Sequence, residues 1–430
     1  MELSKRLARL GLRRGVASLA RGRQDSAIPP PSRRTCPEVE RRGSAIEELV
    51  AGEVVETELG ACFRAEESFS LDYVHGSLSG LSPGTGSLAS LLGQSPQAAA
   101  GLARNEQLSA LDFQQAAFLD TETTGLAGGT GTYVFLVGVG YFSNAAFHVA
   151  QFFMRGLEEE QAMLRMLAGF LDRFRAVVSF NGQAFDLPLL RTRFTLAHMA
   201  PCLTDLPHFD LLFPARRLWR ARLDSCALSA LEADILGVYR GSSDVPSWQI
   251  PALYTDYLRT GDAQEMARVF YHNQQDVLSL VVLAGHMCQL FSDPWAALPC
   301  AADLYSLGRI YESLALIGEA ERAYRAALGG SLPQELHDHT LRCLSFLLKR
   351  QERREEAAEL WWKAVADGRQ LYPYVELAKH YEWHAKDWAR AAEVTRRALD
   401  QLEIAPPGPQ RRRAQAELRY RLARLERKMG

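Results

Sequence analysis

Two carboxylates spaced two residues apart, Asp120 and Glu122, follow the apolar residues Phe118 and Leu119. Residues i and i+2 of a β-strand point to the same face, so both carboxylates would project from one side of a strand. Two such charges repel each other and lose hydration on burial unless a cation neutralises them. Oxygen ligands suit Mg²⁺ or Mn²⁺. The pair indicates a divalent metal site, and a solvated strand end is the alternative.

A third candidate ligand, Asp186, follows a turn at Asn181-Gly182 and precedes Pro188, a residue that favours the first turn of a helix. The apolar run 176–180 before the turn predicts a central strand, and residues 187–196 predict a helix. Ligands collect beyond the carboxyl ends of strands in open α/β sheets, which is where Asp186 would then lie. A helix cap is the alternative role for an Asp at this position.

The fourth candidate is Asp276, in the segment FYHNQQDVLSLVVLAGHM that starts at Phe270. The apolar run after it predicts a helix with one buried face, and an acid at the edge of that face is costly unless it is paired or binds a metal. His272 precedes Asp276 by one helical turn on nearly the same face, and Tyr271 lies about 100° further around the helix. A general base that takes a proton from water is expected here, and the helical geometry favours His272 over Tyr271.

These residues need elements that bring them together, and the surrounding sequence supplies them. The stretch from Phe118 to Phe142 predicts a β-hairpin, because two apolar runs flank the turn LAGGTG. Residues 158–174 predict an amphipathic helix with acids in its first turn. Strand and helix signals alternate from about 110 to 291, which is typical of an α/β domain with a central mixed sheet and flanking helices.

Together the motifs resemble those of a known family. Asp-Thr-Glu at 120–122, Asn-Gly-x-x-Phe-Asp at 181–186 and an aromatic residue one turn before Asp276 resemble the three exonuclease motifs of the DEDD superfamily, which have a ribonuclease H-like fold. The longer stretches FLDTETTGLAGGTGTYVFLVGVG, FNGQAFDLPLLRTRF, HFDLLFPARRLWR and HNQQDVLSL resemble the bacterial YprB-type ribonuclease H-like proteins, which are predicted exonucleases. The resemblance covers about residues 110–290.

The resemblance implies a 3′–5′ exonuclease that acts on single-stranded nucleic acid, with two Mg²⁺ or Mn²⁺ ions held by Asp120, Glu122, Asp186 and Asp276. One departure concerns the general base. The superfamily's His variant usually has its base five residues before the last Asp and its Tyr variant four before, whereas here Tyr271 stands at five and His272 at four. The family pattern therefore leaves both residues open as the base.

Several further residues are candidates for substrate binding. Thr123 adjoins the first acidic pair, and Asn181 either contacts the sugar or serves only as a turn residue. Arg216, Arg217 and Arg220 cluster around Trp219, which predicts phosphate binding with base stacking, or else a solvated helix face with Trp219 in the core. Asp210 is a helix cap or a further acid of the site, and residues 223–237 predict a helix that ends at Gly237.

Beyond Pro299 the pattern is purely helical. Small and aromatic residues recur at the spacing of a tetratricopeptide unit, first at Gly308, Tyr311, Ala320, Tyr324 and Ala327, and twice more further on. The second domain is therefore expected to be an all-α tetratricopeptide-like repeat domain. Such stacks present a groove that usually binds protein segments, and a helical brace for the nuclease is the alternative. Pro406 to Pro409 separates this array from a basic C-terminal helix.

The whole chain of 430 residues is long enough for two or three domains. We expect a basic tail (1–45), an accessory segment (46–109), the α/β domain (110–292), the repeats (300–402) and the basic helix (403–430). Seven cysteines without a CxxC pair favour reduced thiols in the cytoplasm, and no apolar run is long enough for a membrane span. A catalytically inactive, nuclease-like scaffold that binds proteins through its repeats is the rival function.

Overall fold

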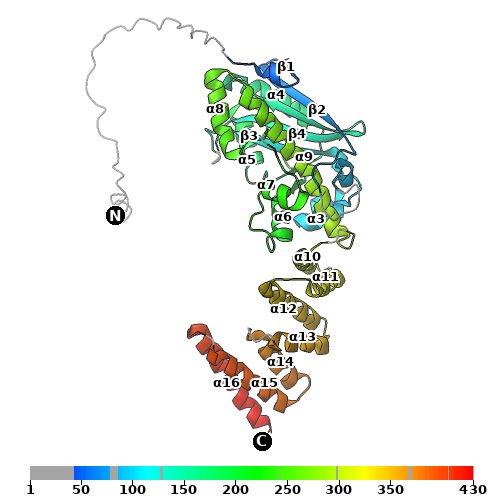
Figure 1. The fold of residues 1–430 in the computed structure, drawn as a ribbon, viewed down its shortest axis with the longest axis vertical. Coiled ribbons are helices and arrows are strands. Elements are labelled where there is room, and N and C mark those ends of the chain that lie inside the picture. Colours follow the sequence, from blue (N-terminus) through cyan, green and yellow to red (C-terminus); the bar gives the residue numbers. More distant parts are fainter. Residues whose placement is uncertain are drawn as a thin grey trace, which may run out of the picture. The chain divides into compact units, whose positions relative to one another are not determined.

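One seven-stranded mixed sheet organises the first half of the chain, in the strand order β1-β2-β5-β4-β3-β6-β7 (Figure 1). Neighbours from β1 to β3 in this order are antiparallel, and β6 and β7 join β3 in parallel. The strands are β1 (Gly52–Thr57), β2 (Gly60–Ser70), β3 (Ala116–Thr123), β4 (Val134–Ser143), β5 (Ala146–Phe153), β6 (Ala176–Ser179) and β7 (His208–Asp210).

The computed structural model describes residues 43–77, 86–125, 129–241, 243–296, 299–366, 370–404 and 406–429. All of them belong to one compact unit, Arg41–Gly430. The predicted basic tail, 1–45, lies outside the described residues except for its last three. No helix among the described residues is long and apolar enough to cross a membrane.

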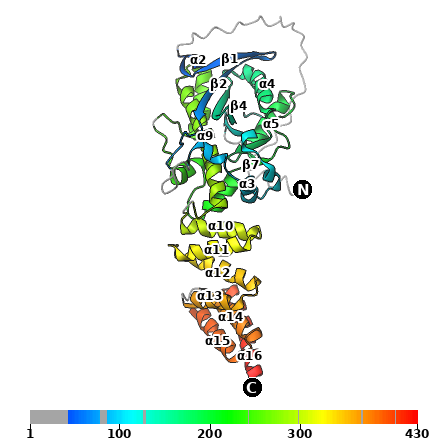
Figure 2. The same ribbon diagram turned by 90° about the vertical axis from the view of Figure 1, so that its right-hand side faces the viewer.

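The two faces of the sheet are covered by different helices because side chains alternate along each strand. Ala117 and Leu119 of β3 belong to the core that contains α4 (Glu160–Leu171) and α5 (Asp186–Leu196). Phe118 belongs to the core on the other face, which contains the part of α9 (Gln264–Ser292) after Val277. Figure 2 shows α4 and α9 on opposite sides of β4. The antiparallel β3–β4 pair agrees with the predicted hairpin.

The other helices of this half are short. They are α2 (Ile46–Leu49), α3 (Pro96–Ala103), α6 (Leu212–Trp219), α7 (Leu228–Leu231) and α8 (Ile250–Thr260). The helix predicted for 223–237 starts only at Leu228, because the Ser225 hydroxyl accepts the Ala227 N–H and forms a turn instead. It continues through a π-helical turn and ends at Gly237, whose φ of 62° is left-handed as the sequence predicts.

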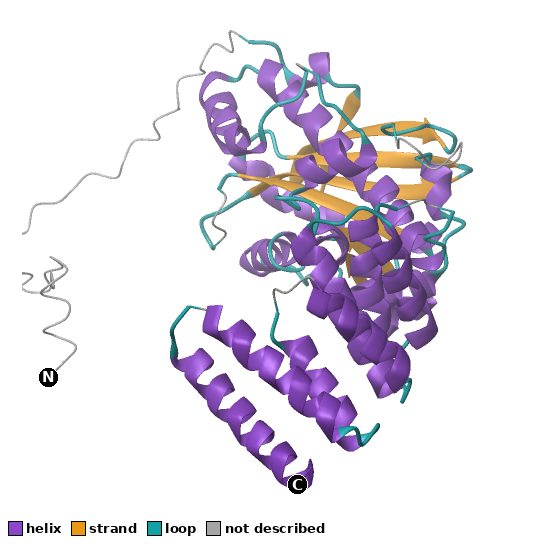
Figure 3. Cartoon of the chain, turned by 60° about the horizontal axis from the view of Figure 1, so that its bottom comes forward, coloured by secondary structure: helices purple, strands orange, loops and turns teal. Residues whose placement is uncertain are grey.

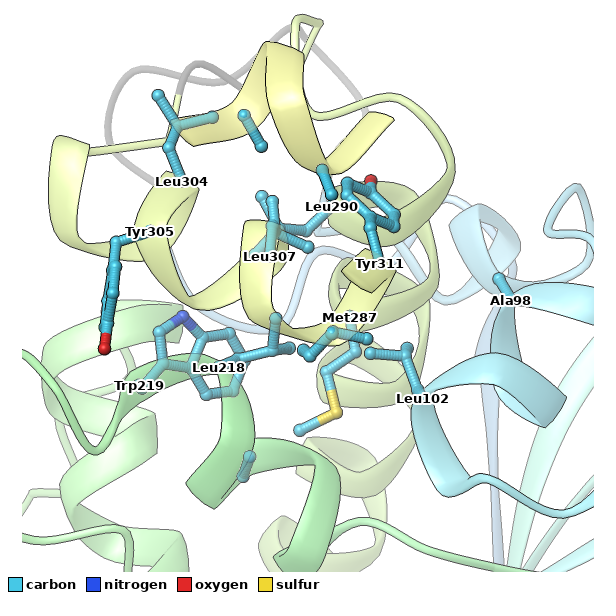
Figure 4. Packing of buried hydrophobic residues seen from close by; sticks show 14 of the residues in the cluster. Ala98, Leu102, Leu218, Trp219, Met287, Leu290, Leu304, Tyr305, Leu307 and Tyr311 are labelled. Atoms are coloured by element: carbon cyan, nitrogen blue, oxygen red, sulfur yellow. The ribbon is translucent and has the colours of Figure 1, made fainter. Parts of the chain in front are cut away.

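From α10 on the chain is helical (Figure 3). Helices pack in consecutive pairs, α10 (Ala301–Ser313) with α11 (Ile317–Gly329), α12 (Gln334–Arg350) with α13 (Arg354–Ala366), and α14 (Tyr372–Trp383) with α15 (Trp388–Ile404), and α16 (Pro409–Met429) packs on α15. Figure 4 shows Leu307 of α10 with Leu290 and Met287 of α9 and Leu218 of α6, in the same cluster as Leu304 and Trp219. The apolar core of the sheet domain therefore continues into the helical region.

Candidate metal centre

Strand β3 and helix α9 together bring the first acidic pair and Asp276 into one place. The Asn273 amide of α9 donates a 2.8 Å hydrogen bond to Asp120 Oδ2. Ligand atoms of Glu122, His272 and Asp276 all lie within 4.8 Å of one another, so these three residues could hold a metal ion. The helix approaches the strands this closely because β4 has a glycine at position 138, where a Cβ would lie 2.2 Å from Asn273 Oδ1.

Asp186 joins this group from the other side of β3. It is the first residue of α5, and Phe185 is the N-cap, so the alternative role of a capping Asp is not seen. Thr121 stands between the two acids of β3 in the sequence, and its hydroxyl donates a hydrogen bond to Asp186 Oδ1. The turn at Asn181-Gly182 lies against the same carboxylate, because a Cβ on Gly182 would be 3.2 Å from Asp186 Oδ2.

The four carboxylates interact strongly through their charges. Burial, followed by repulsion from Asp276, Glu122 and Asp186, raises the pKa of Asp120 well above its usual value. Burial and repulsion from Asp276 and Asp186 do the same to the pKa of Glu122. Burial raises the pKa of Asp186 to about 6 even though Thr121 and a backbone N–H stabilise its carboxylate. Carboxylates arranged in this way ionise together only when a cation joins them.

His272 is buried and has defined partners on both ring nitrogens. Its Nδ1 lies 2.7 Å from Asp244 Oδ1, and its Nε2 lies 3.1 Å from Ser247 Oγ and 3.5 Å from Asp276 Oδ2. Nδ1 is also 3.1 Å from a guanidinium nitrogen of Arg240, which can only donate. The shorter contact to Asp244 favours the tautomer with the proton on Nδ1. Nε2, whose nearest partners are Ser247 Oγ and Asp276 Oδ2, then carries the lone pair.

Arg240 also belongs to this site, although no pattern in the sequence predicted it. Its guanidinium donates to Asp276 Oδ1 and to Glu232, and lies 3.6 Å from Asp244 Oδ2. Glu232 is buried and also accepts a hydrogen bond from Ser279, whose hydroxyl lies 2.8 Å from His75 Nε2. His75 is therefore part of the hydrogen-bonded network behind Arg240. Asp244 and Ser247 lie in the Pro-bounded loop 244–251, for which no site residue was predicted, and Arg240 precedes this loop.

The side chains present fit a divalent cation. Six carboxylates gather in and around the site. Among the described residues, Arg240 is the one arginine that forms ion pairs with any of them. The six are Asp120, Glu122, Asp186, Glu232, Asp244 and Asp276. Such an excess of buried negative charge destabilises the fold unless it is protonated or bound to a cation. The donor set is oxygen-rich with one imidazole, which suits Mg²⁺ or Mn²⁺.

The remaining predicted residues lie around this centre in different ways. Tyr271 lies close to Tyr73. The pKa of the Tyr73 phenol is raised mainly by burial and further by the nearby Tyr271. The Thr123 hydroxyl is buried and donates to the Gly125 carbonyl at 2.9 Å, as a turn residue does. Asn181 has a left-handed φ of 64°, and its N–H donates to Asp210 Oδ1. Asp210 also accepts the Leu212 N–H at the start of α6, as a cap would.

The predicted arginine cluster divides into surface and core. Arg216 and Arg220 are exposed and Arg217 is half-buried. Trp219 is fully buried and parallel to the His286 ring, with 6.0 Å between ring centroids. The interpretation of Trp219 as a base-stacking residue is therefore wrong, because its ring has no free face. The arginines remain candidates for phosphate binding.

Comparison with known proteins agrees with this architecture. Residues 117–288 match a family described as the RNase_H superfamily. The chain is also 31% identical over 315 residues to the uncharacterized protein YprB of Bacillus subtilis (strain 168). The aligned region covers 72% of this chain and 74% of the relative. The matched segment contains β3, α5 and α9, which carry all four candidate carboxylates. The chain therefore belongs to the YprB family and has a ribonuclease H-like domain.

Proposed function

We propose that this protein is a metal-dependent 3′–5′ exonuclease that hydrolyses phosphodiester bonds of single-stranded nucleic acid. Its ribonuclease H-like domain supports nuclease activity. The observation that carries the proposal is the convergence of Asp120, Glu122, Asp186 and Asp276 from three separate elements beside His272. In a domain with a purely structural role, four clustered like charges would destabilise the fold without a compensating function.

In this proposal the four carboxylates would hold two divalent ions, Mg²⁺ or Mn²⁺, which when bound would supply Lewis-acid chemistry for water activation and for charge on the phosphodiester oxygens. His272 accepts the proton of the water at Nε2, while Asp244 holds the Nδ1 proton and fixes the ring. Asn181, Thr123 and the α6 arginines contribute to holding the substrate.

Hydrolysis of 5′-labelled single-stranded DNA and RNA with Mn²⁺ tests the proposal. Wild type should shorten the strand from its 3′ end, and Asp120→Ala and Asp276→Ala should lose this activity. Mn²⁺ binding measured by calorimetry gives a second readout and should weaken in both substituted proteins. If wild type hydrolyses the strands no faster than these two proteins do, the rival function of a nuclease-like scaffold that binds proteins is favoured.

The choice of general base has its own test. His272→Gln should reduce kcat by about 10²–10⁴-fold, the usual contribution of a general base, while Mn²⁺ affinity stays close to that of wild type. Tyr271→Phe should leave kcat nearly unchanged. Loss of Mn²⁺ affinity in His272→Gln would make this residue a metal ligand, and a large loss of kcat in Tyr271→Phe would transfer the base role to Tyr271.

We also propose that the three helix pairs α10–α15, which fill the predicted repeat region 300–402 and end at Ile404, are tetratricopeptide-like units. The small residue at the start of the pattern supports this, because a Cβ on Gly308 would lie 2.6 Å from the Tyr324 ring of the paired helix. The nuclease domain would then extend over 110–292, after an accessory segment, 46–109, that supplies the edge strands β1 and β2. The described cysteines are all unpaired, which agrees with action in the cytoplasm.

A further inference from the structure

The feature from which we start is a pocket of about 600 Å³ at the junction of α3, α6, α10 and α12. Five arginines line it, Arg104, Arg216, Arg217, Arg220 and Arg309, together with His339. Glu335 is the one carboxylate in its lining. Among the described residues, no carboxylate forms a salt bridge with any of the five. The pocket thus gathers positive charge that the protein itself leaves uncompensated.

The arginines are held in this arrangement by contacts to uncharged groups. Arg104 donates to Ser313 Oγ of α10 at 2.8 Å, and Arg217 donates to the Leu102 carbonyl of α3. Burial, and then repulsion from Arg104, lower the pKa of the Arg217 guanidinium. Like charges fixed side by side are unfavourable in the free protein and become favourable when an anion lies between them.

This pocket is joined to a second pocket, which reaches the turn beside Asp186. Arg216 and Arg220 line both, and the second pocket, of about 740 Å³, also has Phe180 and Asn181 in its wall. Asn181 and Gly182 form the turn that lies against Asp186. Asp210 fixes this geometry, because its carboxylate binds both the Asn181 N–H and the first turn of α6. The two pockets together form a surface that leads from Asn181 along α6 to Arg104 and Arg309, with Asp224 as the one carboxylate lining the second pocket.

We propose that this surface is a track for the backbone of single-stranded nucleic acid and that the first helical repeat forms its far end. The proposal rests on the proposed function, which supplies the reacting end of the strand at Asp186. A flexible polyanion suits the track because arginines spread along a groove bind successive phosphates. The helical region would then contribute directly to substrate binding through Arg309 of α10, besides any protein that it binds.

The test compares short and long oligonucleotides on the full chain. Fluorescence anisotropy measures the binding of labelled strands in EDTA, which prevents hydrolysis. A strand of about 4 nucleotides matches the smallest usual site of a single-strand binder, and one of about 20 nucleotides exceeds the largest. Arg104→Gln/Arg309→Gln should weaken binding of the long strand about tenfold and leave the short strand unchanged. For this variant, the plot of log affinity for the long strand against log salt concentration should have a slope that is less steep by about 1.4, because two phosphate contacts are lost.

A charge-matched control is Lys363→Gln/Lys386→Gln, which removes two exposed positive charges elsewhere in the helical region. It should bind both strands as wild type does. Thermal unfolding should show all three proteins folded to the same extent.

The proposal is overturned if the Arg104/Arg309 variant binds the long strand like wild type or loses both strands equally. It is also overturned if an oligo-glutamate of equal charge displaces the long strand as well as nucleic acid does. Wild type that binds but never hydrolyses would refute the proposed exonuclease while leaving this track intact.

Discussion

At the scale of single residues, Arg240 has the most unusual surroundings. Its guanidinium forms ion pairs with Glu232, Asp244 and Asp276, and its side chain is 11% exposed. Removing one partner of a buried ion-pair network leaves the others as uncompensated charges, which costs far more than the net contribution of the intact network. Arg240 therefore stabilises the acidic centre when no metal is bound, and a metal ion would take over part of that task.

We expect Arg240→Gln to lower the free energy of unfolding of the metal-free protein by about 3–5 kcal/mol. Added Mn²⁺ should recover part of the loss, because it neutralises the same carboxylates. Urea unfolding with EDTA and with Mn²⁺ measures both quantities. Arg259→Gln is the matched control, since its side chain is 74% exposed and pairs only with Asp256, and it should cost less than about 1 kcal/mol. Equal losses in the two variants would contradict the role given to Arg240.

Asp186 makes the stability of the metal-free protein depend on pH. Its pKa is raised from 3.8 to about 6 in the folded chain, so the folded state binds its proton more tightly than the unfolded state. The stability that this proton contributes is complete below pH 4 and is lost as the pH rises to about 6, by about 3 kcal/mol at most. Asp120 and Glu122, with pKa values raised well above normal, extend the loss to higher pH.

Unfolding of wild type and Asp186→Asn in EDTA, followed across pH 4 to 7, isolates this contribution. Wild type should lose stability relative to the variant as the pH rises, because the amide cannot ionise. With Mn²⁺ the trend for wild type should reverse, since ionised carboxylates bind the metal better. A constant difference between the two metal-free proteins over this range would show that Asp186 ionises normally.

At the scale of elements, the approach of α9 to the sheet determines whether the site forms. The sequence Gly138-Val139-Gly140 in β4 leaves room for this helix, because a Cβ at Gly138 would overlap Asn273 and one at Gly140 would lie 2.5 Å from Val277 Cγ1. Asn273 in turn binds Asp120. The two glycines thus allow close packing, and the packing positions the amide that orients the first carboxylate.

Gly138→Ala should therefore destabilise the protein by about 1–3 kcal/mol, the usual range for overpacking, and reduce nuclease activity by displacing Asn273. Gly169→Ala provides the contrast. Gly169 lies inside α4 with nothing within 4 Å of its Cβ position, so the substitution should stabilise the protein by about 0.5–1 kcal/mol and leave activity unchanged. Thermal unfolding and the hydrolysis assay measure the two effects, and a harmless Gly138→Ala would refute the packing argument.

The elements that carry the four acids were predictable because their signals are local. Apolar runs indicated β3 and α9, and the turn at Asn181-Gly182 with Pro188 indicated α5, without knowledge of their partners. The loop between α7 and α8 gave no such signal. Arg240, Asp244 and Ser247 reach the site through contacts with residues of α9 that are 36, 28 and 25 positions away. Trp219 was ambiguous for the same reason, since its burial depends on α9 and α10.

At the scale of the whole described unit, the sheet domain and the helical region share one apolar core. The cluster that contains Phe118 of β3 runs through α9 and includes buried residues of α10 to α16. Arg222, just beyond α6, and Asp303 of α10 add a salt bridge of 3.0 Å at the junction. A continuous core of this kind is expected to unfold cooperatively, whereas separate cores joined by a linker unfold independently.

Leu307 tests this coupling, because it is fully buried in α10 and faces Met287 and Leu290 of α9 (Figure 4). Leu307→Ala should lower the free energy of unfolding by about 2–5 kcal/mol through lost contacts and a cavity. Hydrogen exchange should then accelerate in β3 and α9 as well as in α10 to α12. Leu425→Ala is the control, since Leu425 is equally buried but lies in a separate small cluster with Ala391 and Ala392. Its effect should stay within α15 and α16. If the Leu307 substitution accelerates exchange only from α10 onward, the sheet domain folds independently of the helical region. The helical region would then be an appended module and not a brace for the candidate metal centre.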